Sequence, residues 1–276
     1  MTNKIKLTEK YLVYNGSIQL VAEFYYSYSN SARVIYEVVR VKDSIPIFLE
    51  YHLDRLFNSI KLLKLLGPNR NSLISNIKEL LLKNPVIENN IRVSLVYDMS
   101  ALPNLIIYFI PSTYPTYDQR ENGIEVKTLD ANRTNPNIKV ENSELREQVD
   151  KIISDTGCFE VLLINQDGFI TEGSRSNIFF IKNDTLYTPP LEMVLGGITR
   201  QVLINISNSQ GISLKVEPIP EGSLSQFDGA ILTGTSPGFL PIALIDEEHY
   251  NNNHPLIKLL VSSYNDSIQN DIETWM

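Results

Sequence analysis

Two parts of the chain have the chemistry of anion binding. The segment 195–200 reads LGGITR, with two glycines directly before a predicted helix start. Glycines there leave backbone N–H groups uncovered, at the end of the helix dipole that attracts an anion. Arg55, on an earlier predicted helix, offers a planar and permanently charged guanidinium. Taken alone, the glycines are also typical of an ordinary helix N-cap, and Arg55 of a solvated helix face.

A lysine and a glutamate lie in two further segments that stand out. Lys139 lies in the polar stretch NPNIKVEN (135–142), and Glu172 lies in the run DGFITEGSRSNIF (167–179). An amine becomes a nucleophile only when burial or a nearby cation lowers its pKa from about 10.4. We therefore expect Lys139 to point inward from the end of a strand. Without the other segments, the same lysine would be read as exposed.

The first part of the chain alternates strands and helices. Strands are predicted over 34–41, 91–97 and 104–111. A helix is predicted where Leu53, Leu56 and Ile60 recur at helical spacing, and the pair Gly67-Pro68 ends it. A second helix follows the possible cap Ser72. These elements predict an N-terminal α/β lobe over 1–115 with a mainly antiparallel sheet.

The rest of the chain has a different pattern. The stretch STYPTYDQRENG lacks any hydrophobic period and predicts a linker at 116–123. A polar helix is predicted at 143–156 and another from Thr199, between many short strands joined by tight turns. These strands indicate a larger C-terminal lobe over 124–276 with a barrel-like β-sheet, so the fold class is α+β with two lobes.

Composition excludes several classes of function. The 276 residues carry a formal charge of -8 with a pI near 5.0, which disfavours nucleic acid and anionic membranes as partners. The single cysteine, Cys158, cannot form an internal disulfide, and the three histidines lack metal-ligand spacing. No apolar run approaches the ~20 residues of a membrane span. We expect a cytoplasmic enzyme without a metal.

Five segments together resemble a known family. They read YEVVR (36–40) with HLDRL (52–56), then NPNIKVEN, DGFITEGSRSNIF, LGGITR and TGTSP (233–237). Their order and spacing are similar to those of the class IV (fold type IV) aminotransferases, over residues 11–246. That family includes branched-chain and D-amino acid aminotransferases and aminodeoxychorismate lyase, and its cofactor is pyridoxal 5′-phosphate (PLP).

The resemblance implies a role for each matching residue. Lys139 would form the Schiff base with PLP and move the substrate proton. Glu172 would face the pyridine nitrogen, and a carboxylate there keeps the ring protonated. The remaining cofactor-binding residues implied are Arg55, Leu195, Ile198, Thr199 and Thr235. Those implied for the substrate pocket are Tyr36, Arg33 and Ser236.

The chain departs from the family pattern in places that bear on substrate. Residues 32–34 read ARV in place of a glycine-rich turn, so Arg33 is either a carboxylate-binding cation or a surface or dimer-contact arginine. The strand reads VSLVY at 93–97, without the Arg-x-His pair that grips the carboxylate in D-amino acid aminotransferases. This disfavours D-amino acids.

The resemblance predicts transfer of an amino group from an amino acid, with branched-chain ones among the candidates, to a 2-keto acid. It also implies a homodimer. Two alternatives stay open: an aminodeoxychorismate lyase, which forms pyruvate and 4-aminobenzoate, and a non-catalytic relative that keeps the fold.

Overall fold

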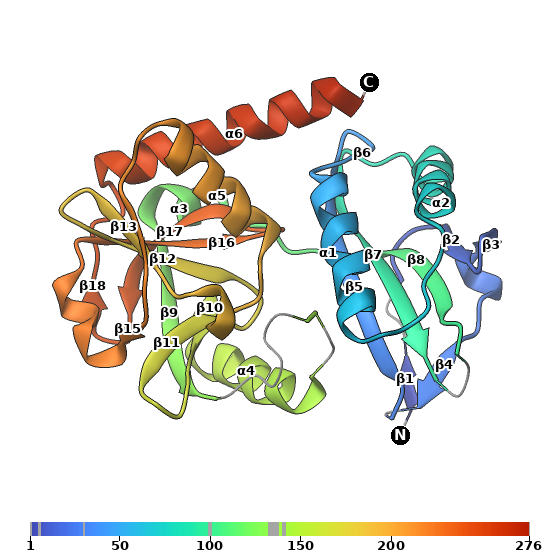
Figure 1. Cartoon of the computed structure of the whole chain (residues 1–276), viewed down its shortest axis with the longest axis horizontal. Coiled ribbons are helices and arrows are strands. Elements are labelled where there is room, and N and C mark those ends of the chain that lie inside the picture. The colour runs from blue at the N-terminus through green and yellow to red at the C-terminus, as the bar shows by residue number, and fades with distance from the viewer. Residues whose placement is uncertain are drawn as a thin grey trace. The chain divides into compact units, whose positions relative to one another are not determined.

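A computed structural model describes residues 2–4, 7–29, 31–98, 101–131, 138–139 and 142–275, and the chain divides into two compact units (Figure 1). Unit 1 comprises Met1–Thr113, Ile138–Glu141 and Asp271–Met276, and unit 2 comprises Tyr114–Asn137 and Asn142–Asn270. The sequence pattern placed all of 124–276 in one lobe. Two short segments of that range instead group with unit 1, and one of them contains Lys139.

Unit 1 is built on an antiparallel sheet. Among its described residues, six strands follow the order β3-β2-β8-β7-β5-β6, and β1 pairs separately with β4. The longest pair, β5 with β7, runs in continuous register from Arg33↔Tyr97 to Lys42↔Glu88. The elements are β1 Thr2–Lys4, β2 Tyr11–Tyr14, β3 Ser17–Leu20, η1 Val21–Glu23, β4 Ser27–Ser29, β5 Arg33–Lys42, β6 Ile45–Pro46, α1 Leu49–Leu62, α2 Arg70–Lys83, β7 Glu88–Tyr97 and β8 Asn104–Ile110.

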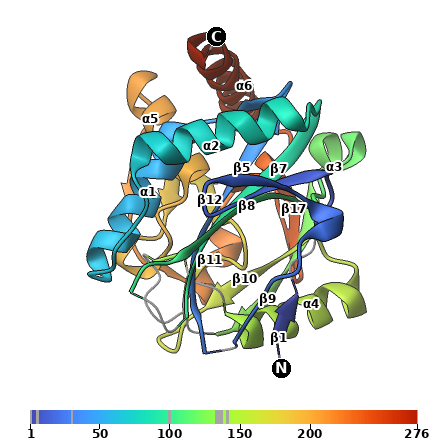
Figure 2. The same cartoon turned by 90° about the vertical axis from the view of Figure 1, so that its right-hand side faces the viewer.

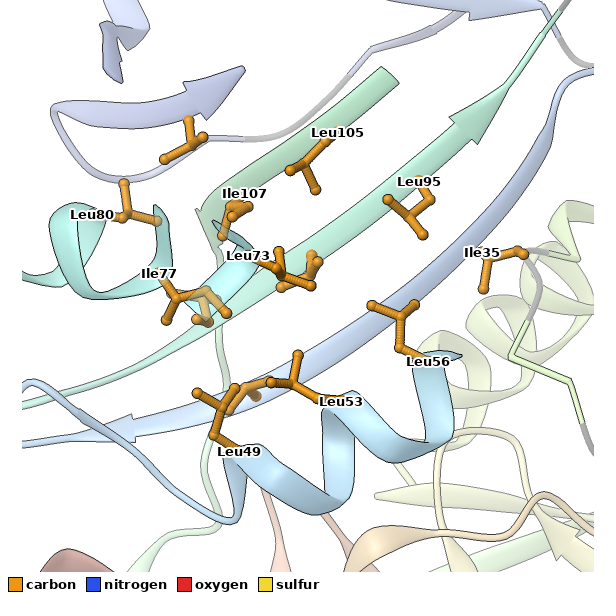
Figure 3. Packing of buried hydrophobic residues seen from close by; sticks show 14 of the residues in the cluster. Ile35, Leu49, Leu53, Leu56, Leu73, Ile77, Leu80, Leu95, Leu105 and Ile107 are labelled. Atoms are coloured by element: carbon orange, nitrogen blue, oxygen red, sulfur yellow. The ribbon is translucent and has the colours of Figure 1, made fainter. Parts of the chain in front are cut away.

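Helices α1 and α2 cover one face of this sheet (Figure 2), and Figure 3 shows the leucine- and isoleucine-rich core between them. Side chains alternate across a strand, so Ile35 and Val39 of β5 enter this core, whereas Val34 enters a second cluster. The cap of α2 is Asn69, whose side chain accepts from the Ser72 backbone N–H. The prediction of Ser72 as the cap was wrong, because Asn69 reaches the N–H three residues on.

Unit 2 carries a larger, curled sheet. In its described part, ten strands form one sheet in the order β14-β13-β12-β16-β17-β9-β10-β11-β15, with β18 paired to β17. Parallel pairs such as β9 with β10 and antiparallel pairs such as β16 with β17 are mixed. The strands are β9 Ile124–Asp130, β10 Glu160–Ile164, β11 Phe169–Gly173, β12 Asn177–Lys182, β13 Thr185–Thr188, β14 Leu214–Val216, β15 Ile219–Pro220, β16 Gly229–Gly234, β17 Gly238–Ile245 and β18 Glu248–His249.

The helices of unit 2 include one that the sequence pattern did not predict. Residues Tyr117–Asn122 form α3 inside the predicted linker, because Thr116 and Gln119 make a reciprocal capping box that starts a helix without a hydrophobic period. The predicted polar helix is α4, Ser143–Thr156. The others are η2 Leu191–Met193, α5 Ile198–Ser209, η3 Glu221–Gln226 and α6 Pro255–Trp275. No helix in the described ranges has the length and apolar character needed to cross a membrane.

Candidate functional site

Lys139 lies along the edge of β5 in unit 1. The Tyr36 backbone N–H donates to the Lys139 carbonyl at 3.3 Å, which anchors the segment to the strand. The Lys139 side chain is half-buried, and its Nζ lies 5.1 Å from the centroid of the Tyr36 ring. An ammonium at this distance from an aromatic face is within cation–π range. The other residues of the NPNIKVEN stretch, apart from Ile138 and Asn142, lie outside the described residues.

Arg92 of β7 approaches the same ring. Its guanidinium carbon lies 4.0 Å from the Tyr36 ring centroid, and its Nε donates to Ser94 Oγ at 3.0 Å. In the β5–β7 register Tyr36 lies opposite Ser94, so Arg92 projects from the same face of the sheet as Tyr36. No role was predicted for Arg92, which directly precedes the stretch VSLVY at 93–97. The signal available in the sequence was the alternation of side chains along a strand, which places residues 92 and 94 on the same face.

A buried ionic cluster lies on the opposite face of β5. Glu37 is 2 % exposed and accepts from Arg55 Nε at 2.8 Å and from Arg55 Nη2 at 2.6 Å. His52 Nδ1 lies 2.8 Å from Glu37 Oε2. Because α1 places His52 and Arg55 three residues apart, both side chains reach the one carboxylate. A glutamate in the middle of the apolar run VIYEVVRV is the sequence signal for such a partner.

The charges of this cluster follow from burial and pairing. Burial alone would raise the pKa of Glu37, but the charge and hydrogen bonds of Arg55, with His52, outweigh it and lower the pKa to about 2. Burial lowers the pKa of His52, and Glu37 opposes this effect only in part. Glu37 is therefore ionised and His52 neutral at pH 7. The bidentate pair fixes the plane of the Arg55 guanidinium, the group predicted to bind phosphate.

In unit 2, the carboxylate of Glu172 is buried within β11. It is 2 % exposed, and its Oε2 accepts from the Leu195 backbone N–H at 2.9 Å and from Asn177 Nδ2 at 3.2 Å. Asn177 Nδ2 also donates to the Leu195 carbonyl at 2.9 Å. The side chain of Asn177 therefore ties Glu172 to the loop before α5. No role was predicted for Asn177 from the sequence, although it falls inside the DGFITEGSRSNIF run.

That loop ends in a helix start suited to an anion. Gly197 is the N-cap of α5, and no side chain caps this end in the described structure. A Cβ at Gly197 would lie 2.0 Å from Asn177 Oδ1, so only glycine fits there. Ile198 and Thr199 form the first turn of α5, and both are buried. The first N–H groups of a helix have no partner within the helix and bind anions readily.

The turn after Glu172 is held by a second buried acid. Glu160, 6 % exposed, accepts from Ser174 Oγ at 2.6 Å and from Ser176 Oγ at 2.9 Å. It also accepts from the backbone N–H groups of Val161 at 2.9 Å and Arg175 at 3.2 Å. This set of donors compensates for the burial of the carboxylate and fixes the path of the chain beyond Glu172.

The remaining predicted residues have varied surroundings. Thr235 and Ser236 are half-buried in the turn between β16 and β17. On β16, Thr233 lies opposite Asn177, and its buried hydroxyl has no hydrogen-bond partner in the described part of the structure. Arg33, at the start of β5, is exposed. The structure thus groups Lys139, Tyr36 and Arg92 in unit 1, and groups Glu172 and Leu195 with the start of α5 in unit 2.

Comparisons with known proteins agree with the family that the motifs indicated. A family model described as amino-transferase class IV matches residues 34–245. A branched-chain-amino-acid aminotransferase of Pseudomonas aeruginosa is 28% identical over 235 residues, covering 77% of this chain and 76% of the relative. A D-alanine aminotransferase of Bacillus licheniformis is 26% identical over 233 residues, covering 80% and 82%.

A solved structure shows the same fold. The branched-chain amino acid aminotransferase from Escherichia coli has a TM-score of 0.82 at 21% identity, covering 95% of each chain. The predicted two-lobed α+β fold is confirmed. Since the family model spans well over half of the sequence, the chain belongs to the class IV aminotransferases.

Proposed function

We propose that this chain uses PLP to transfer the amino group of an amino acid, with branched-chain amino acids as candidate donors, to a 2-keto acid. The observation that carries the proposal is that Lys139 and Arg92 both lie over the Tyr36 ring. The Lys139 amine is 5.1 Å and the Arg92 guanidinium carbon 4.0 Å from the ring centroid. When bound, PLP supplies an aldehyde that reacts with amines and a ring that withdraws electrons from the substrate.

The groups present fit this cofactor. PLP needs an amine for its aldehyde, an acid for its ring nitrogen and an anion site for its phosphate. Lys139 supplies the amine. Glu172 supplies the acid, and its buried Oε2 accepts from two N–H groups. The uncapped start of α5 supplies N–H groups of Ile198 and Thr199 for the phosphate.

Other residues would complete the binding of the cofactor. We assign further phosphate contacts to Arg55, because its pairing with Glu37 orients the guanidinium, and to Thr235, because its side chain is half-buried in the β16–β17 turn. Leu195 lends the backbone N–H that holds Glu172. The contacts cited for each of these residues lie within its own unit.

Lys139 would act in proton transfer as well as in binding. Its Nζ would take the substrate Cα proton and return it, as general base and then general acid. The Tyr36 ring restricts where Nζ can lie, because the contact favours a position over the aromatic face. An amine held in one place transfers a proton more effectively.

Arg92 is suited to bind the substrate carboxylate. Its cation is half-buried on the face of the sheet that also carries Tyr36, and its Nε is held by Ser94. A planar guanidinium binds a carboxylate with two parallel hydrogen bonds. The strand reads Arg92-Val93-Ser94, so no histidine stands two positions after this arginine. We therefore favour L-amino acids as donors, with Ser236 and Arg33 as further pocket residues to test.

The test begins with the purified chain and PLP. We expect visible absorption from the lysine-bound cofactor, its loss in Lys139→Ala, and its retention in the matched control Lys215→Ala, whose lysine lies on β14. Branched-chain L-amino acids should discharge the band, whereas D-alanine should not. A wild-type protein that stays colourless in excess PLP would indicate the non-catalytic relative. Pyruvate and 4-aminobenzoate formed from aminodeoxychorismate without a keto acid would indicate the lyase instead.

We further propose that the chain works in the cytoplasm as a homodimer. The family resemblance implies the dimer, and the single cysteine is compatible with a reducing compartment. Light scattering from the purified protein should give twice the chain mass of 31.4 kDa. A mass equal to one chain at micromolar concentration would contradict the dimer.

A further inference from the structure

One side chain in unit 2 connects the two groups that the proposed function assigns to opposite ends of the cofactor. Asn177 is 5 % exposed and begins β12. Its Nδ2 donates both to Glu172 Oε2 and to the Leu195 carbonyl, and the Leu195 N–H returns to the same Oε2. Three hydrogen bonds thus form a closed set between the acid, the amide and the loop.

The other atom of the amide is equally constrained. Asn177 Oδ1 occupies the space in front of Gly197, the N-cap of α5, where an added Cβ would lie 2.0 Å away. Because both partners of Nδ2 are acceptors, the amide has only one orientation that satisfies them, with Oδ1 toward the glycine. The amide therefore sets the position of the carboxylate on one side and the approach of the helix start on the other.

We propose that Asn177 is a positioning residue that fixes, with one amide, both the carboxylate predicted to face the ring nitrogen and the helix start predicted to hold the phosphate. The inference rests on the proposed PLP function. Thr233, directly opposite on β16, does not share this role, because its buried hydroxyl has no hydrogen-bond partner in the described part of the structure. Replacing Asn177 should consequently weaken the contacts to both ends of the cofactor together.

Substitutions at this position separate the two functions of the amide. Asn177→Asp keeps the shape but replaces the donor with a second carboxylate oxygen facing Glu172, so like charges repel. Asn177→Ala removes both the donor and the atom in front of Gly197. We expect each variant to lower PLP affinity roughly 10- to 100-fold, the range for losing hydrogen bonds to a charged group.

The readouts distinguish positioning from general structural support. Glu172→Gln should chiefly change the pH dependence of the visible absorption, and Thr199→Ala should chiefly lower PLP affinity measured by equilibrium dialysis. Asn177→Asp should do both, with its spectral pH profile moved toward that of Glu172→Gln. The exposed Asn205→Ala on α5 is the matched control and should do neither. Unfolding of the cofactor-free proteins is measured alongside, because a purely structural loss would lower only the midpoint of unfolding.

A double-mutant cycle tests the contact with the glycine. Gly197→Ala should weaken PLP binding, whereas Gly222→Ala, where nothing lies within 4 Å of the added Cβ, should not. In the Asn177→Ala background, Gly197→Ala should cost little more, because the clashing oxygen is gone. Additive losses, or wild-type affinity and pH profile in Asn177→Asp, would overturn the inference while leaving the proposed function intact. A wild-type protein without PLP binding would overturn the proposed function and this inference with it.

Discussion

The buried pair of Glu37 and Arg55 allows a quantitative prediction about stability and cofactor binding. Replacing Glu37 with glutamine keeps the size of the side chain and one acceptor oxygen but removes the negative charge. The Arg55 side chain is 12% exposed, so its cation would remain mostly desolvated without a counter-charge. His52 would also lose its charged partner. We expect a large destabilisation, because removing one partner of a buried ion pair leaves the other charge buried without compensation.

The magnitude follows from the geometry in two ways. The charge centres of a bidentate pair lie about 4 Å apart, which gives about 4 kcal/mol of attraction at an effective dielectric constant of about 20. The same pairing, with the hydrogen bonds and the cost of burial included, lowers the pKa of Glu37 from 4.5 to about 2, which corresponds to about 3 kcal/mol at pH 7. Since glutamine retains one acceptor, we expect Glu37→Gln to lower the free energy of unfolding by about 3 kcal/mol.

The assay is urea unfolding at pH 7 of the cofactor-free protein, monitored by circular dichroism. The matched control is Glu50→Gln on α1, whose carboxylate is 68% exposed and pairs with Arg70 at 2.6 Å. That surface pair should contribute at most about 1 kcal/mol. PLP affinity should fall only in Glu37→Gln, because Arg55 loses its orienting partner. Equal stability of the two variants would refute the assignment of Glu37 as an ionised, stabilising counter-charge.

Three further predictions concern other buried polar groups. His52 is neutral when folded but is protonated below about pH 6.5 in the unfolded chain, so stability should fall as pH drops from 7 to 5.5, and less steeply in His52→Gln by urea midpoints. Glu160→Gln should lower the free energy of unfolding by about 2–4 kcal/mol, because the new amide N–H₂ would point at groups that now donate hydrogen bonds to the carboxylate. An unchanged urea midpoint would contradict this. Asn84→Ala should cost about 2 kcal/mol by the same measurement, since this buried side chain both accepts from and donates to the Tyr11 backbone, whereas the exposed Asn58→Ala should cost almost nothing.

The sequence predicted the elements better than it predicted their contacts. The polar helix at 143–156 matches α4, because its amphipathic period and its Gly157 C-cap are both local signals. The helix inside the predicted linker was missed, because six residues cannot display a hydrophobic period and the capping box was overlooked. Local signals therefore identified elements where they were long enough to be read.

Long-range pairing accounts for the contacts that could not be predicted from the sequence. Arg92 meets Tyr36 only because β5 and β7 pair in one particular register, and a slip by one residue would turn Arg92 to the other face. The grouping of Lys139 with unit 1 likewise depends on a contact with the edge of β5, 103 positions earlier in the chain. The family motifs named Lys139 as a candidate, but its surroundings required the fold.

Three of the candidate groups in this protein are each contacted by a side chain to which the motifs assigned no supporting role. Glu37 orients Arg55, the Tyr36 ring contacts Lys139, and Asn177 holds Glu172. Tyr36 and Glu37 are neighbours in β5, so the pleat sends one to each face, and a single strand supplies both supports. Through Tyr36 and Glu37, β5 contacts both Lys139 and Arg55, and an amine held in one place transfers a proton more effectively. Substituting Glu37 or Asn177 should therefore weaken cofactor binding or shift its spectrum even though Arg55, Lys139 and Glu172 are intact.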